Sequence, residues 1–302
     1  MALISIITPT YNRAKEIERL YKSLKSQTLQ DFKWIIVDDG SNDNTFEVIK
    51  NFKDKRIKYI WQENKGVNFA RNRGDQEIKK EYVIYLDSDD ILFENTTLEF
   101  MYKEIKNSGD EIGRVDLNVV NFSKEENMKI KHNRLIVNYE DAICEKKIHG
   151  EVFSIYKSET IKFSNWPDID GMEAIRHWRI LKYKTALFIN KPGRIYFDQT
   201  NVKRLSNPKG LIKRAKSLKK GCDILIREHL ENWKLLCPAQ IGKYNYNKVL
   251  YSLLSDDYVD VFNSVRLAII YGEYKIKFKT IMLCILFVCP LALRRKIFIF
   301  LR

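Results

Sequence analysis

The chain has 302 residues, of which 45% are hydrophobic and 30% are charged, and this composition excludes a disordered or fibrous protein. Its length fits one large domain, or a large domain and a small one. The net charge of +14 is uneven, because residues 1–200 contain 33 Lys and Arg against 32 Asp and Glu, whereas residues 201–302 contain 20 against 7. The basic last third therefore suits an anionic surface, either nucleic acid or phospholipid headgroups.

The first ninety residues alternate between short apolar runs and helical patterns. The pattern predicts strands at 3–7, 34–37, 57–61 and 82–86, and helices over 14–27, 45–52 and 67–80. Strands that alternate with helices of this length indicate βαβ units, a mostly parallel sheet and helices on both faces. In such sheets ligands bind beyond the carboxyl ends of the strands.

Three polar loops should meet at that edge: TPTYNR (8–13), DDGSNDNT (38–45) and DSDD (87–90). In the third loop Asp87, Asp89 and Asp90 repel one another unless a positive charge lies among them. One acid is enough to cap a helix. Mg²⁺ or Mn²⁺ prefers hard oxygen ligands and usually keeps substrate phosphates as further ligands. An acidic turn alone is compatible with either a helix cap or a metal site.

The rest of the chain changes character near residue 209. SNWPDIDGMEAIRHWRI (164–180) runs from acidic residues into an expected helix, and helical patterns follow from about residue 211. We therefore expect one domain over 1–208 and a basic helical region over 209–302. Its segment 281–293 is mostly apolar but too short for a bilayer span, which needs about twenty residues. It fits an interfacial membrane segment; the alternative is a helix docked on the protein's own core or on another subunit, so an oligomer could form there.

The motifs TPTYNR, IIVDDGSNDNT, NKGVNFARNRG and YLDSDD, in this order and spacing, resemble those of the GT-A family-2 glycosyltransferases. The resemblance covers roughly residues 1–200. It implies an α/β fold of the GT-A type and an inverting transfer of a sugar from a nucleotide diphosphate donor to an acceptor hydroxyl. It also implies a divalent metal, Mn²⁺ or Mg²⁺, and UDP as the leaving nucleotide.

The resemblance assigns roles around the nucleotide residue by residue. Pro9, Thr10 and Tyr11 match the loop that lines the nucleoside, with the tyrosine ring available to stack on the base. Asp39 matches the acceptor of a hydrogen bond from uracil N3–H, although it could also simply cap its turn. Arg71 matches a basic residue near the base and diphosphate, for which a guanidinium is geometrically suited.

Further roles fall on the neighbouring loops. Asn64 and Gly66 shape the loop before Arg71. The alternative is that they form a plain turn before a helix without contacting the donor. Asp87 matches the first acid of the DxD motif, which faces the ribose or donor sugar and could also touch the metal. Ser88 lies in the same donor site, and Asp89 matches the metal-binding acid. Asp90 would cap or support the loop.

The expected catalytic base departs from the family pattern. Relatives carry Gly-Glu-Asp or Gly-x-Asp before a helix, whereas GMEAIRHWR places Glu173 in that position. A glutamate carboxylate can deprotonate a hydroxyl that it reaches by hydrogen bond. Asp170 or Asp168 would serve if the loop is shifted, and a capping-box role for Glu173 stays open.

Two other functional classes compete with this reading. A sugar nucleotidyltransferase should carry a glycine-rich basic loop after the first strand, which TPTYNR lacks. A non-catalytic nucleic-acid-binding protein would explain the charge, but the charge avoids the loop edge and no nucleic-acid motif is present, so we expect no nucleic-acid partner.

The expected partners are a nucleotide-sugar donor, a glycan or lipid-linked acceptor of lipopolysaccharide or capsule type, and an anionic membrane surface. The start MALISIITPT lacks a basic segment and predicts no cleaved signal peptide. We therefore expect a cytoplasmic protein, peripheral on the inner face of the cytoplasmic membrane.

Overall fold

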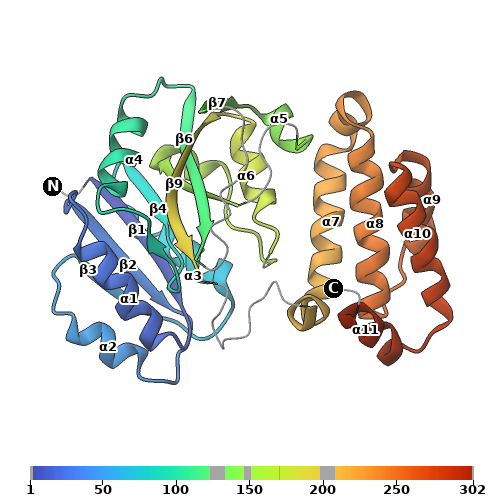
Figure 1. Ribbon diagram of the computed structural model, residues 1–302, viewed down its shortest axis with the longest axis horizontal. Coiled ribbons are helices and arrows are strands. Elements are labelled where there is room, and N and C mark those ends of the chain that lie inside the picture. The colour runs from blue at the N-terminus through green and yellow to red at the C-terminus, as the bar shows by residue number, and fades with distance from the viewer. Residues whose placement is uncertain (1–2, 123–132, 146–150, 170, 198–207, 301–302) are drawn as a thin grey trace. The chain divides into compact units, whose positions relative to one another are not determined.

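The computed structural model describes residues 3–122, 133–145, 151–169, 171–197 and 208–300 (Figure 1). Contacts divide the chain into two compact units. The first comprises residues 1–168 and 176–200 and is built on a sheet; the second comprises residues 169–175 and 201–302 and is helical. The short segment 169–175 thus groups with the helical unit, which its position in the sequence did not indicate.

The N-terminal half of the sheet is parallel. Its strands pair in the order β3-β2-β1-β4, with bounds β1 Ile4–Thr10, β2 Phe32–Asp38, β3 Ile57–Trp61 and β4 Tyr82–Tyr85. Side chains alternate between the two faces of a strand, so Ile4 and Ile6 enter one core cluster and Ile7 enters the other. The four expected strands are therefore confirmed, and their carboxyl ends share one edge.

Helices cover both faces of this sheet (Figure 1). The first cluster gathers α1 (Ala14–Lys25), α2 (Thr45–Asn51) and α4 (Thr97–Lys106) against the sheet. Helix α1 contributes Ile17, Leu20 and Leu24, whose spacing puts them on one side of the helix. The second cluster gathers α3 (Val67–Asp75), the 3₁₀ segment η1 (Ser158–Phe163) and α6 (Ala174–Leu181).

The second half of the sheet is mixed rather than parallel. Strand β8 pairs antiparallel with β4 and β6, whereas β9 pairs parallel with β6 and antiparallel with β5 and β7. The bounds are β5 Ile91–Leu92, β6 Ile112–Asn121, β7 Arg134–Val137, β8 Val152–Lys157 and β9 Thr185–Tyr196, with the short helix α5 at Tyr139–Ile143. The α/β class is confirmed, and the mostly parallel sheet holds for the first four strands.

The second unit consists of helices joined by short turns. They are α7 Pro208–Leu236, α8 Ala239–Ser255, α9 Val261–Tyr271, α10 Tyr274–Ile285, the 3₁₀ segment η2 Leu286–Val288 and α11 Leu291–Phe300. Trp233 of α7 stacks on Tyr244 of α8 with ring centroids 4.9 Å apart. Gly242 of α8 lies against the turn at Gly272, where a Cβ would come within 2.3 Å of the glycine backbone. Over the described residues, no helix is long and apolar enough to cross a bilayer.

Candidate active site

The loops that follow β1, β2 and β4 are joined at one edge of the sheet. The Asn12 N–H donates to Ser41 Oγ at 2.9 Å, and the Asp39 N–H donates to the Thr10 carbonyl at 2.8 Å. Arg13 Nη2 lies 3.4 Å from Asp89 Oδ2 and so connects the first loop to the third. The parallel topology predicted this meeting of loops, and the contacts confirm it.

The end of β1 presents groups that a nucleoside could contact. Pro9 and Thr10 are buried, whereas Tyr11, directly beyond the strand, is 45% exposed. The Thr10 hydroxyl is buried and makes no hydrogen bond to any residue in the described part of the chain. A buried hydroxyl without a partner is costly, so this group lacks a compensating contact in the described part of the chain.

Asp39 holds the loop that precedes α3. Its Oδ1 accepts from Gln62 Nε2 at 2.7 Å and from the Lys65 N–H at 3.0 Å, and its Oδ2 accepts from the Gly66 N–H at 2.8 Å. Gly66 has φ 103° and ψ 159°, a conformation that favours glycine. A carboxylate has about four acceptor positions, so one remains after these three bonds. The turn itself is capped by Asp38, whose Oδ1 accepts from the Ser41 N–H at 2.8 Å.

Asn64 belongs to the same loop and is exposed. Gly40, with φ 83°, allows the two loops to approach, because a Cβ there would lie 2.9 Å from the Asn64 backbone nitrogen. The predicted residues Asp39 and Asn64 are therefore brought together, the first as the group that orders the loop and the second as part of the loop surface.

Three arginines pair with acidic side chains of the loop, and a fourth, Arg19, donates to the Asp89 carbonyl at 2.5 Å. Arg71 Nη2 lies 2.8 Å from Asp87 Oδ1, and Arg194 Nη1 lies 2.6 Å from Asp90 Oδ2 and 3.7 Å from Asp87 Oδ2. Arg13 is the third, beside Asp89.

The three acids differ in exposure. The side chains of Asp87 and Asp89 are 33% and 21% exposed, whereas that of Asp90 is only 6% exposed. Asp87 and Asp89 can therefore reach a ligand, and Asp90 lies in the interior with Arg194.

Burial and charge act differently on these acids. Burial opposes the ionisation of Asp87, but the guanidinium groups of Arg71 and Arg194 outweigh it, so the pKa of Asp87 lies below its ordinary value. Burial raises the pKa of Asp90 well above its ordinary value, although Arg194 counteracts it. Asp90 and its neighbours Glu151 and Asp87 overcome burial to raise the pKa of Arg194, which stays charged. The loop therefore contains an ionised and accessible carboxylate, that of Asp87, and a buried ion pair between Asp90 and Arg194.

Arg194, like Arg13, was not among the predicted site residues. It lies on β9, far from the DSDD motif in the chain, and its guanidinium also pairs with Glu151. The available signal was a single arginine in the apolar run GRIYF (193–197). An arginine is rarely buried unless it pairs with an acid. Here the paired acids, Asp87 and Asp90, belong to the loop after β4.

A stack of arginine and aromatic side chains fixes the start of α6 beside this edge. The guanidinium of Arg71 lies 4.6 Å from the Trp166 ring centre, and that of Arg176 lies 4.4 Å from it. Arg176 Nη2 also donates to the Tyr85 hydroxyl at 2.9 Å and lies 3.2 Å from an oxygen of Asp75. Helix α6 is thus held against the end of β4 and against α3.

The candidate bases lie in the segment before α6. Asp168 is exposed, Glu173 is half-buried and immediately precedes the helix, and Asp170 lies outside the described residues. Glu173 groups with the second unit and Asp168 with the first. The assignment of the base stays a prediction.

Comparisons with known proteins identify the family. Residues 5–176 match the family model of glycosyl transferase family 2. The chain is also 31% identical over 210 residues to the GalNAc(5)-diNAcBac-PP-undecaprenol beta-1,3-glucosyltransferase of Campylobacter jejuni, covering 67% of each protein. The chain belongs to glycosyl transferase family 2. It is therefore a glycosyltransferase. Several other curated relatives are matched over less than two fifths of their own length.

Solved structures show that this family-2 glycosyltransferase has a GT-A fold. Residues 1–349 of TarS from S. aureus, in complex with UDP-GlcNAc, align with a TM-score of 0.58 at 16% identity, covering 90% of this chain and 93% of that one. The mannosyltransferase PcManGT of Pyrobaculum calidifontis, in complex with GDP-Man and Mn²⁺, aligns with a TM-score of 0.55 at 16% identity, covering 98% and 86%. Because both structures are only 16% identical to this chain, their similarity supports the fold alone.

The glycosyltransferase offers two carboxylates to a divalent ion. Within the described ranges no group of three or more His, Cys, Asp or Glu side chains forms a metal cluster. Asp87 and Asp89 nevertheless present accessible oxygen ligands at the loop edge. Mg²⁺ is commonly bound by one or two carboxylates with substrate phosphates and water as the other ligands. The donor set therefore fits an ion held jointly by protein and nucleotide.

Proposed function

We propose that this family-2 glycosyltransferase transfers a sugar, with inversion, from a UDP-sugar to an acceptor hydroxyl in the synthesis of a surface polysaccharide, and that it uses Mn²⁺ or Mg²⁺. The observation that carries the proposal is the loop edge itself. Asp87 and Asp89 expose carboxylates beside the two loops that Asn12 and Asp39 hold in place. The complexes of TarS with UDP-GlcNAc and UDP support the choice of nucleotide.

The nucleoside would lie against the end of β1. The exposed ring of Tyr11 can stack on the base. The remaining acceptor position of Asp39 would receive the uracil N3–H. Cytosine has an acceptor at N3, so this contact favours a uracil nucleotide.

The transfer is a single displacement. The Glu173 carboxylate removes the proton of the acceptor hydroxyl, whose oxygen attacks the anomeric carbon from the face opposite UDP. The bond from that carbon to the diphosphate oxygen breaks, its electron pair goes to UDP, and the anomeric configuration inverts. An ion bound by Asp89 and Asp87 would neutralise charge on the leaving diphosphate. Arg71 keeps the Asp87 carboxylate ionised and oriented toward the donor.

The acceptor would be a growing glycan or a lipid-linked precursor of lipopolysaccharide or capsule type. The name of the Campylobacter relative places its own acceptor on an undecaprenol carrier. Such an acceptor and the basic residues of the second unit together support a peripheral position at the inner face of the cytoplasmic membrane.

The test is donor binding followed by donor turnover. Thermal unfolding should shift upward with UDP and Mn²⁺ together, and the Asp39→Asn variant should lose most of that shift. RNA is the control ligand for the nucleic-acid alternative. A shift with RNA and none with UDP and Mn²⁺ would contradict the proposal.

A further inference from the structure

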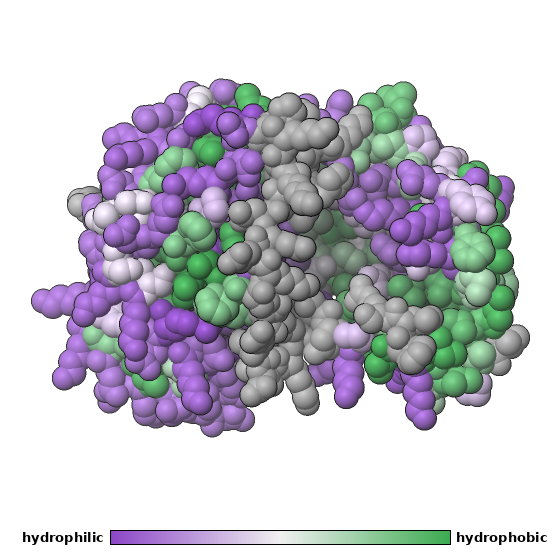
Figure 2. Space-filling model, viewed as in Figure 1, coloured by the Kyte–Doolittle hydropathy of each residue, from purple (hydrophilic) through white to green (hydrophobic). Residues whose placement is uncertain are grey.

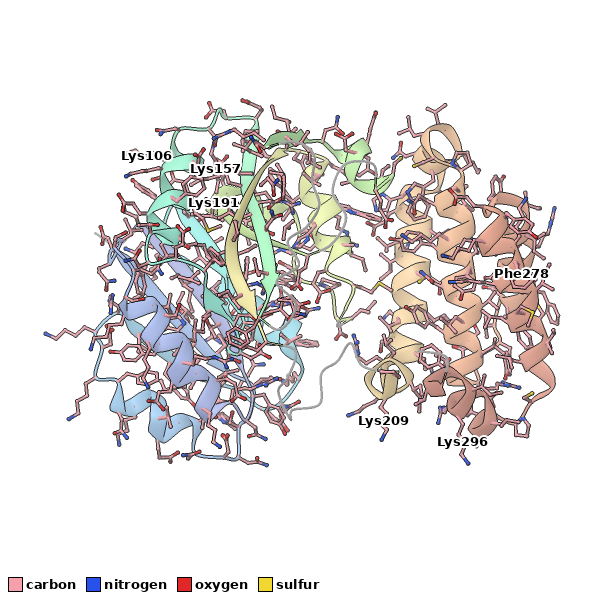
Figure 3. The ribbon with its side chains drawn as sticks, in the orientation of Figure 1. Lys106, Lys157, Lys191, Lys209, Phe278 and Lys296 are labelled. Carbon is pink, nitrogen blue, oxygen red and sulfur yellow. The ribbon has the colours of Figure 1, made fainter. Side chains whose placement is uncertain are left out.

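Helix α10 carries an apolar stripe on its exposed side. The side chains follow helical spacing along one face, and each is about half exposed or more: Tyr274, Phe278, Ile281, Met282 and Ile285. Tyr274 is 85% exposed and Phe278 is 57% exposed. Figure 3 labels Phe278 at the outer side of this helix, and Figure 2 shows hydrophobic residues gathered over this part of the second unit.

The opposite face of α10 and the segment after it pack inward. Thr280 is fully buried, and Leu283 and Phe287 lie against the cluster formed by Val249, Leu253 and Val261. Leu283 and Phe287 of segment 281–293 therefore dock on the protein's own core, whereas Ile281, Met282 and Ile285 face outward, and a membrane contact of the segment stays a prediction. The exposed stripe also begins seven residues before the segment that the sequence indicated.

Basic residues accompany this stripe, and an exposed acid, Glu273, lies at the N-cap of the helix directly before Tyr274. Residues 274–302 contain seven Lys and Arg and no Asp or Glu. Lys275 and Lys279 are exposed and each follows a stripe residue by one position, and Lys277 is half-buried between them. Arg294 and Arg295 are instead engaged with the backbone carbonyls that close neighbouring helices.

We propose that the α10 stripe binds an anionic lipid bilayer, with its apolar side chains among the upper acyl chains and its lysines at the headgroups. The twelve-residue helix is about 18 Å long, shorter than the roughly 30 Å of the hydrocarbon core, so it lies along the interface and does not cross it. This inference goes beyond the proposed transfer reaction, since it concerns a surface formed wholly by the second unit.

A second copy of the chain is the competing occupant. In a two-fold symmetric dimer the same patch meets itself, so Lys275, Lys277 and Lys279 of each copy would approach those of the other. Like charges brought together and desolvated are unfavourable. Anionic headgroups, by contrast, complement these lysines.

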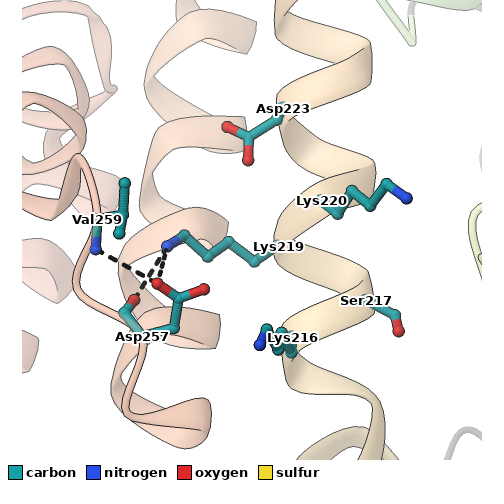
Figure 4. A pocket seen from close by; sticks show the side chains of 7 residues that line it. All are labelled: Lys216, Ser217, Lys219, Lys220, Asp223, Asp257 and Val259. Atoms are coloured by element: carbon teal, nitrogen blue, oxygen red, sulfur yellow. Dashed lines mark hydrogen bonds and ion pairs between the residues drawn. The ribbon is translucent and has the colours of Figure 1, made fainter.

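A second basic surface on α7 provides the matched control. A pocket of about 460 Å³ lies between α7 and the loop after α8, lined by Lys216, Lys219, Lys220, Asp223 and Asp257 among others (Figure 4). Lys219 Nζ lies 2.9 Å from Asp257 Oδ1, so this surface is partly neutralised by its own acids. Among the residues that line it, Val259 is the apolar one and is 70% exposed.

The test is co-sedimentation with vesicles of phosphatidylcholine alone and of phosphatidylcholine with an equal amount of phosphatidylglycerol. The protein should bind the anionic vesicles, and high salt should weaken binding. Each lysine near such a surface contributes about fivefold in affinity, so Lys275→Gln/Lys277→Gln/Lys279→Gln should lose on the order of 10²-fold. The control Lys213→Gln/Lys216→Gln/Lys220→Gln removes the same charge from α7 and should bind within about twofold of the parent.

A second variant tests the apolar contribution. Phe278→Ser/Ile281→Ser replaces exposed side chains and should abolish vesicle binding while leaving thermal unfolding and UDP release in solution unchanged. Equal losses in both lysine variants, or no binding to anionic vesicles, would overturn the proposal. Light scattering that shows a dimer, converted to a monomer by Phe278→Ser/Ile281→Ser, would instead assign the stripe to a second copy. Because UDP release is measured without vesicles, failure of the transferase proposal is distinguishable from failure of this one.

Discussion

Replacement of Arg194 by methionine should destabilise the fold through the acidic loop. Arg194 is buried and pairs with Asp90 at 2.6 Å, with Asp87 at 3.7 Å and with Glu151. Arg194→Met keeps a long apolar stem but leaves Asp87 and Asp90 without this partner. Removal of one partner from a buried ion pair costs about 3–5 kcal/mol. At about 2–4 °C per kcal/mol, the melting temperature should fall by roughly 6–20 °C.

Thermal and urea unfolding of three variants measures this effect. The control is Arg134→Met, because Arg134 pairs with Glu104 while largely exposed, and such a pair contributes about 0–1 kcal/mol. The double variant Arg194→Met/Asp90→Leu should recover part of the lost stability, because it also removes the Asp90 carboxylate that Arg194→Met leaves buried without a partner. Equal melting temperatures for Arg194→Met and Arg134→Met would refute the role assigned to Arg194.

Four further predictions concern the site. Asp89→Ala should abolish Mn²⁺-dependent UDP release, measured by a coupled assay, with little change in melting temperature. Glu173→Gln should keep UDP binding by calorimetry but lose about 10²–10⁴-fold in transfer; full transfer would move the base to Asp168 or Asp170. Gly66→Ala should cost about 1–3 kcal/mol in urea unfolding and weaken UDP binding. The pKa of Asp87 is lowered, so its ionised form stabilises the fold above about pH 4 and this is lost on acidification; Asp87→Asn should show a smaller stability loss below that pH.

Local patterns were sufficient to predict the first half of the sheet. The β3 bounds agree with the expected run at 57–61, and helix α1 begins at the expected residue. Each of these elements has its own apolar period and is followed by a polar loop. The short strands β5 and β7 have little pattern of their own and depend on pairing with β9, which no local signal in the sequence indicates.

The candidate site was predictable where its residues follow consecutive parallel strands. Asp39 and Asp87 lie directly after β2 and near the end of β4, so topology alone brought them to one edge. Arg194 comes from a strand in the mixed half, and its contact with Asp90 spans 104 positions of the chain. The repulsion among the acids of DSDD was evident from the sequence, as was Arg71, but the pairing of Asp90 with Arg194 depends on the position of β9 in the sheet.

We propose that the loop edge binds a UDP-sugar for transfer. The most direct measurement is UDP release from a panel of UDP-sugars, with Mn²⁺ and with chelator, for the parent protein and Asp89→Ala. We expect metal-dependent UDP release from at least one UDP-sugar by the parent protein and none by Asp89→Ala. UDP release that is equal in the two proteins, or no release and no stabilisation by UDP with Mn²⁺, would contradict it.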